Sequence, residues 1–227
     1  EAISLALQEM GITVAANYAG NDEKAKAFTE RTGIAAYKWD VGDHEATLAG
    51  CQKVAEDLGP VDIVVNNAGI TRDGVLQRMS FDDWNDVMRV NLGGCFNMAK
   101  ATFGGMRERG WGRIVNFASL QSFRAFPGGI AYGASKGGVA QMTRAMAEAW
   151  SRHGINVNAL APGFVRTELT APVFNDPERA ARNAAQTCIG RNGEPEDMDG
   201  PLLFLCSEAS NYVTGQILML DGGFTAK

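Results

Sequence analysis

Two hydrophobic periods alternate along the chain. Short apolar runs bounded by polar, Gly or Pro residues predict β-strands, and longer stretches with apolar residues every three or four positions predict helices. Because strands and helices alternate, we expect an α/β fold, with a doubly wound parallel sheet covered by helices on both faces. Strands are expected at 12–18, 34–41, 61–66, 113–118, 155–160 and 216–220, and helices at 21–32, 43–58, 81–108, 132–153 and 194–207.

The chain shows no internal repeat, low-complexity tract or linker, so residues 1–227 are expected to form a single domain. Residues 161–192 contain four helix- or strand-breaking residues, Pro162, Gly163, Pro172 and Pro177, and no regular element is expected there. Long irregular segments of this kind often cover a substrate, so we expect a lid.

The first residues are typical of a helix that ends before Gly11. In a Rossmann-like fold, a strand and a glycine-rich turn come before the first helix and hold the pyrophosphate of a dinucleotide. We expect both to be absent from these residues, either because about 12–18 residues precede them or because the protein is damaged. The first alternative is favoured, since a sheet without its central strand leaves backbone groups unpaired.

Composition and charge exclude several classes of function. The net charge is −5, which disfavours nucleic acid and anionic membranes as partners. No apolar run is long enough to span a bilayer. The four cysteines are scattered and only two histidines occur, so we expect no metal site, no histidine-based triad and a cytoplasmic location.

The candidate chemistry lies in residues 132–136, YGASK. Tyr132 and Lys136 are four residues apart, so they lie on one face of a helix, one turn apart. A lysine cation beside a phenol favours the phenolate and lowers the tyrosine pKa from its usual value of about 10. Ser119, thirteen residues before Tyr132, could hold a substrate carbonyl against the phenol. The group predicts proton transfer to or from an oxygen, as in carbonyl–alcohol redox chemistry.

Four motifs occur together in the order NNAG (66–69), Asn91, Ser119 and YxxxK. In this combination they resemble the short-chain dehydrogenase/reductase family. The resemblance implies that Tyr132 is the general acid for reduction and that Lys136 also binds the nicotinamide ribose. It also implies that Ser119 binds the substrate oxygen, with Ser122 as the alternative, and that Asn91 holds a water in a proton relay. Asn91 could instead form only a side-chain-to-backbone bond.

The same resemblance implies a dinucleotide site. Asp40 and Val41 match a pair that contacts adenine. Asn17 and Tyr18, near the end of the second strand of the family fold, offer no carboxylate for a ribose 2′-hydroxyl, and Lys24 is near, so we expect NADPH rather than NADH. The other residues implied to bind the cofactor are Asn67, Ala68, Gly69, Tyr132, Lys136, Pro162, Gly163, Val165 and Thr167, and the substrate set is Ser119, Gln121 and Tyr132.

Finer features of the resemblance divide the chain. The first half resembles NADPH-dependent acetoacetyl-CoA reductases, whereas the segments after about Phe117 resemble sugar and polyol dehydrogenases of the same family. We expect a carbonyl reductase acting on a 3-oxoacyl thioester such as acetoacetyl-CoA. The alternatives are a sugar, polyol or simple secondary-alcohol dehydrogenase and, because the glycine-rich turn is missing, a non-catalytic binding protein. Members of the family usually assemble through helices that begin near Phe81 and Tyr132, which implies a homotetramer or homodimer.

Overall fold

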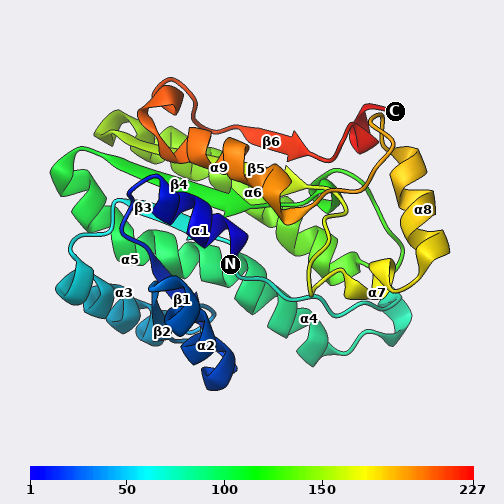
Figure 1. Ribbon diagram of the computed structural model, residues 1–227, viewed down its shortest axis with the longest axis horizontal. Helices are drawn as coiled ribbons and strands as arrows, with labels where there is room; N and C mark the ends of the chain where they lie inside the picture. Colours follow the sequence, from blue (N-terminus) through cyan, green and yellow to red (C-terminus); the bar gives the residue numbers. More distant parts are fainter.

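The computed structural model describes residues 1–227, in which strands and helices alternate (Figure 1). The strands are β1 (Ala15–Tyr18), β2 (Ala35–Lys38), β3 (Ile63–Asn66), β4 (Gly112–Phe117), β5 (Ile155–Pro162) and β6 (Ile217–Leu220). The helices are α1 (Ala2–Glu9), α2 (Asp22–Thr32), α3 (His44–Leu58), α4 (Phe81–Met88), α5 (Gly94–Arg109), α6 (Ile130–Trp150), α7 (Ala171–Phe174), α8 (Pro177–Gln186) and α9 (Asp199–Cys206). The predicted α/β class is confirmed.

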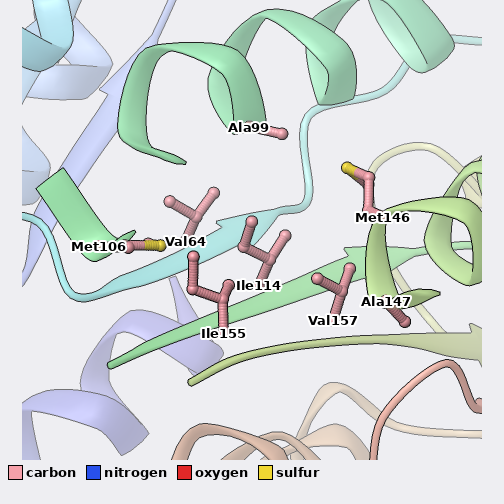
Figure 2. Close-up of a cluster of buried hydrophobic side chains, with 8 residues drawn as sticks. All are labelled: Val64, Ala99, Met106, Ile114, Met146, Ala147, Ile155 and Val157. Carbon is pink, nitrogen blue, oxygen red and sulfur yellow. The ribbon is translucent and has the colours of Figure 1, made fainter. Parts of the chain in front are cut away.

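All strand pairs are parallel, in the orders β1-β2 and β3-β4-β5-β6. Helices cover both faces of the four-stranded sheet, because neighbouring residues of a strand point to opposite sides. Ile114 packs with Ala99 of α5 and Met146 of α6 on one face (Figure 2). Its neighbour Val115 packs on the other face with Leu7 of α1 and Leu202 of α9. The sheet is therefore doubly wound, as predicted.

The two sheets are separated by a cleft of about 900 Å³ between β1 and β3. Its walls include Ala15 and Asn17 of β1 and Ile63 and Val65 of β3. Neither strand has a hydrogen-bonded neighbour on this side. The cleft lies where the central strand of a Rossmann-like sheet would run.

The helix predicted over 81–108 is interrupted by a π-helical turn at Arg89–Gly93, between α4 and α5. The π-helical turn contains one extra residue, and this turns the buried side chain of Asn91 toward the segment after β3, where it hydrogen-bonds Ile70. The helix predicted from Tyr132 begins earlier, at Ile130. Helix α9 is preceded by a 3₁₀ turn at Pro195–Met198.

The segment 161–192 is more ordered than expected, since it contains α7 and α8. Asp176 caps α8 by accepting a hydrogen bond from the Arg179 backbone N–H at 3.0 Å, and Pro177 occupies the first helical position. Proline is favoured at the first helical position, because a backbone N–H there would have no acceptor within the helix and nothing is lost when it is missing. The prediction took Pro177 as a breaker and was wrong here. No helix of the molecule is long and apolar enough to cross a membrane.

Candidate active site

Ser119, Tyr132 and Lys136 meet at the carboxyl end of β4. Ser119 comes two residues after the end of that strand and is buried. Its hydroxyl accepts a hydrogen bond from the Gln121 backbone N–H at 3.1 Å, which starts a 3₁₀ turn. The alternative, Ser122, donates its hydroxyl to the Lys136 carbonyl oxygen at 2.8 Å. The Ser122 hydroxyl is therefore used to connect the 3₁₀ turn after β4 to helix α6.

Tyr132 and Lys136 lie in the first two turns of α6, with the ammonium nitrogen 5.7 Å from the centre of the phenol ring. Burial raises the pKa of Tyr132, and the charge of Asp73 raises it further, whereas the Ser119 hydroxyl lowers it. The pKa of Tyr132 is thus raised, whereas the sequence led us to expect that Lys136 lowers it. Burial also lowers the pKa of Lys136, whose ammonium donates to the Phe117 carbonyl oxygen at 2.6 Å.

Asn91 connects the catalytic helix to the segment that follows β3. Its side-chain oxygen accepts from the Ile70 backbone N–H at 2.8 Å, and its amide donates to the Ile70 carbonyl at 3.0 Å and to the Ser135 hydroxyl at 3.0 Å. Ser135 in turn donates to the Tyr132 carbonyl at 2.7 Å. The alternative that Asn91 bonds backbone groups describes this geometry, although the partner is 21 residues away.

The segment Asn67–Gly69 follows β3 and faces the same group of residues. A Cβ atom at Gly69 would lie 3.4 Å from the Asn91 oxygen and 3.6 Å from the Lys136 nitrogen. The Gly69 backbone thus lies beside both side chains, with room for ordinary van der Waals contact. Pro162 ends β5, and the Gly163 N–H donates to the Leu220 carbonyl at 3.0 Å. In a parallel sheet these carboxyl ends share one edge, where dinucleotides bind.

Gly163 is required by close packing. A Cβ atom there would lie 2.9 Å from the Cα atom of Asp221, a backbone atom that cannot move aside easily. Beyond it, Val165 is buried and pairs with Gly193, while Thr167 is exposed and its backbone N–H donates to the Thr170 hydroxyl at 3.0 Å. The segment after β5 is thus held in place beside the site.

Residues expected near adenine already have protein partners. The Asp40 carboxylate pairs with Arg89 at 2.6 Å and accepts from the Gly42 N–H at 2.8 Å. Val41 is buried, and its carbonyl accepts from the Asn97 amide at 2.8 Å. These bonds fix the turn after β2 against α4 and α5, and they leave this edge of the sheet well defined.

At the end of β1 the Asn17 amide donates to the Trp39 carbonyl at 3.0 Å, so this side chain ties β1 to the end of β2. A carboxylate from α2 lies beside this stretch, since Asp22 hydrogen-bonds Tyr18 and pairs with Lys38 at 2.8 Å. Asp22 begins helix α2 and lies three residues after residues 17–19. The sequence prediction considered only those strand residues and therefore missed it.

Lys24 extends from α2 to the segment after β5, where its ammonium lies 3.1 Å from the Glu168 carboxylate. The side chains of this pair are 70% and 92% exposed, so water competes strongly for both charges. The pair joins α2 to the segment after β5. The expected cofactor residues lie between these two segments, at the carboxyl edge of the strands.

Asp73 is a site residue that sequence reasoning missed. Its charge acts on the Tyr132 phenol, and the neighbouring Gly74 N–H donates to the Gly128 carbonyl at 2.9 Å. The local signal was the Asp-Gly pair in TRDG, one residue after NNAG; such a pair indicates a turn but does not show that its carboxylate lies near Tyr132. Gln121, expected in the substrate set, has a buried side-chain oxygen with no hydrogen-bond partner, lying against Gly129.

Comparison with known proteins places the chain in a family. A family model described as Enoyl-(Acyl carrier protein) reductase matches residues 1–225. The acetoacetyl-CoA reductase of Rhizobium meliloti is 45% identical over 224 residues, covering 98% of this chain and 92% of that protein. The gluconate 5-dehydrogenase of Gluconobacter oxydans is 43% identical over 187 residues, covering 82% of this chain and 73% of that protein.

A comparison with solved structures leads to the same group of enzymes. The crystal structure of a gluconate 5-dehydrogenase from Burkholderia cenocepacia in complex with NADP and tartrate matches with a TM-score of 0.93 at 38% identity, covering 100% of this chain and 90% of that one. The chain therefore belongs to the short-chain dehydrogenase/reductase family, and it is an NAD(P)-dependent oxidoreductase of the carbonyl–alcohol couple. The family prediction is confirmed, and the non-catalytic alternative finds no support.

Proposed function

We propose that the chain is an NADPH-dependent carbonyl reductase whose substrate is a 3-oxoacyl thioester such as acetoacetyl-CoA. The observation that carries the proposal is the grouping of Ser119, Tyr132 and Lys136 at the carboxyl edge of the sheet, beside Gly69. The 45% identity to an acetoacetyl-CoA reductase over nearly the whole chain supports the substrate class.

In the proposed reaction, the Ser119 hydroxyl donates a hydrogen bond to the ketone oxygen and holds it against Tyr132. The phenol gives its proton to that oxygen as the carbonyl carbon becomes a secondary alcohol. The bound nicotinamide supplies the hydride. Burial and Asp73 keep the phenol protonated at neutral pH, which suits a general acid in reduction. Lys136, 3.6 Å from the position of a Cβ atom on Gly69, is available to the nicotinamide ribose.

The residues present fit a dinucleotide, because the Gly69 and Gly163 backbones follow β3 and β5 at the carboxyl edge of the parallel sheet, where dinucleotides bind. Asn67, Ala68, Asp40 and Val41 would line its adenosine side. Pro162, Gly163, Val165 and Thr167 would line its nicotinamide side, as the family resemblance implies. None of these assignments requires a movement of the sheet.

The proposal of NADPH rests on two observations. A related enzyme of known structure contains NADP, and the Asp22 carboxylate near Tyr18 is neutralised by Lys38. A 2′-phosphate could replace Glu168 as the partner of Lys24, since an exposed ion pair is worth at most about 1 kcal/mol. We expect Lys24→Gln to raise KM for NADPH but not for NADH; equal KM values for both cofactors in the unaltered enzyme would refute NADPH preference.

Tyr132→Phe tests the mechanism. Removing only the hydroxyl leaves the ring and its packing in place, so we expect turnover to be lost while NADPH still binds. Fluorescence titration with NADPH checks binding, and absorbance of the cofactor follows turnover. Substantial activity in this variant would rule out Tyr132 as the proton donor.

A gluconate-type dehydrogenase is the second candidate, favoured by the two gluconate 5-dehydrogenases to which the chain is similar. Comparing kcat/KM for acetoacetyl-CoA, 5-ketogluconate and a simple ketone decides between the two. A higher value for the ketogluconate would replace the thioester proposal.

We also propose a homotetramer or homodimer assembled through α4, α5 and α6. Two phenylalanines on these helices have their rings in solvent, Phe81 at 88% and Phe96 at 53% exposed. Large exposed apolar side chains on adjacent helices are typical of an interface. The four free cysteines support the proposed cytoplasmic location.

A further inference from the structure

Arg124 lies in the turn that follows Ser119. Its backbone N–H donates to the Leu120 carbonyl at 2.9 Å, so the chain folds back within one turn of the substrate-binding serine. The side chain is exposed. The turn begins at the carboxyl end of β4, the same edge of the sheet at which Tyr132 and Lys136 lie. Arg124 thus lies at the same edge of the sheet, five residues after Ser119.

An aromatic wall supports the guanidinium. Its central carbon lies 5.5 Å from the ring centre of Phe224, which is buried. The Phe224 ring is 5.8 Å from that of Phe164, and Phe164 is 5.9 Å from Phe126. These rings come from the segments after β6, β5 and β4, so the wall crosses the carboxyl ends of three strands. A cation held over a ring face has less freedom to lose on binding a ligand.

The guanidinium has no acidic partner, unlike its neighbours. Arg166 and Arg191, in the segment after β5, pair with Glu194 at 3.6 Å and Asp197 at 2.6 Å, whereas Arg124 forms no ion pair and donates no side-chain hydrogen bond. The Asp221 carboxylate, three residues before Phe224, accepts hydrogen bonds from the backbone N–H groups of Gly223 at 3.0 Å and Thr225 at 2.9 Å. In a chain of net charge −5, this is an uncompensated cation beside a reaction site.

We propose that Arg124 binds an anionic group at the end of the substrate remote from the reacting carbonyl. A planar guanidinium donates two parallel hydrogen bonds to a carboxylate or a phosphate, so the geometry selects this class of substrate. The inference rests on the proposed function, because Ser119 and Tyr132 must hold the carbonyl. Both candidate substrates carry such an anion: the phosphates of a coenzyme A thioester, or the carboxylate of a sugar acid.

The test compares three ketones in the unaltered enzyme and in Arg124→Gln. They are acetoacetyl-CoA, 5-ketogluconate and the uncharged ethyl acetoacetate. We expect kcat/KM for one anionic ketone to fall by about tenfold or more, as for loss of a charged hydrogen bond, while that for the uncharged ketone is unchanged. The anionic ketone that responds identifies phosphate or carboxylate as the source. Arg124→Lys should lower kcat/KM for that ketone less than Arg124→Gln does, because lysine retains the charge but not the planar fork of donors.

Arg152→Gln is the matched control. Arg152 has no ion pair either, but it precedes β5 and therefore lies at the opposite edge of the sheet. The Arg152→Gln substitution removes the same charge and should leave kcat/KM for all three ketones unchanged. Unchanged kcat/KM for both anionic ketones in Arg124→Gln would overturn the inference, as would an equal loss for the uncharged ketone.

A second measurement separates this inference from the proposed function. If the unaltered enzyme reduces none of the ketones, the proposed function fails. Calorimetric titration with coenzyme A and with gluconate then decides the inference: binding that is lost in Arg124→Gln and kept in Arg152→Gln supports it, and binding of neither anion, or equal binding by all three proteins, overturns it.

Discussion

At the scale of single residues, the site is controlled by burial rather than by one charge pair. Tyr132 and Lys136 are both withdrawn from water, and burial shifts each pKa toward the neutral form. Lys136 lies over the phenol ring and bonds the Phe117 carbonyl, so its charge is not aimed at the hydroxyl. The phenol is therefore in the protonated form at neutral pH, because its pKa lies above the usual value of 10.0.

The raised pKa of Tyr132 predicts a change of stability with pH. The unfolded tyrosine titrates near 10.0, below the folded value. Stability from this group is therefore complete below pH 10.0 and is lost as pH rises toward the folded pKa. Urea unfolding at a series of alkaline pH values should show a steeper loss for the unaltered protein than for Tyr132→Phe. Identical slopes would contradict the raised pKa.

Spectrophotometric titration of the phenols gives an independent check. The difference between the unaltered protein and Tyr132→Phe isolates one phenol, which should ionise above the pH at which free tyrosine does. A difference spectrum centred below pH 10.0 would show that Lys136 dominates after all.

At the scale of elements, the π-helical turn between α4 and α5 is what places Asn91. Without the extra residue, an uninterrupted helix would keep this side chain in register with its neighbours. With it, Asn91 reaches Ile70 and Ser135, and it fixes the segment after β3 to the catalytic helix. A hydrophobic pattern alone predicts one long helix here, since the turn does not change which face is apolar.

Asn91→Ala tests this connection. It removes three hydrogen bonds and leaves the half-buried backbone groups of Ile70 without these partners. We expect the free energy of unfolding to fall by about 2–4 kcal/mol, measured by urea denaturation. Asn85→Ala, at an exposed position of α4 with no side-chain hydrogen bond, should change it by less than about 0.5 kcal/mol. Equal effects of the two substitutions would contradict the role of Asn91.

At the scale of the whole molecule, the strands differ in how deeply they are buried and in how many neighbours they pair with. Residues of β4 are buried along the whole strand, whereas those of β1 are only half-buried and pair with one neighbour. Local opening is easiest where few apolar contacts and few paired backbone groups hold an element. The part that contains β1 and β2 should therefore be the least protected.

Hydrogen exchange measures this difference. Amide hydrogens of Ala15–Tyr18 and Ala35–Lys38 should exchange faster than those of Gly112–Phe117 and Ile155–Pro162, followed by mass spectrometry of peptides from each strand. Equal protection of the two groups of strands would contradict this dependence on burial and pairing.

The proposed assembly makes a further prediction at this scale. Phe96→Asp places a charge on an exposed position of α5 and should give a smaller species in sedimentation experiments. Tyr212→Asp alters a fully exposed aromatic residue outside α4, α5 and α6 and serves as the control. An unchanged mass for Phe96→Asp would place the interface elsewhere.

The sequence by itself determined the α/β class, the positions of the strands and the family, because period, spacing and motif order are local properties that the fold must satisfy. It also brought Ser119, Tyr132 and Lys136 into one group. Only the tertiary structure decided the direction of the Tyr132 pKa, the partners of Asn91 and Lys24, the nearness of Asp73 and the free cation at Arg124. Burial and contacts between segments far apart in the chain depend on how the elements pack, and that is not written in any one stretch of residues.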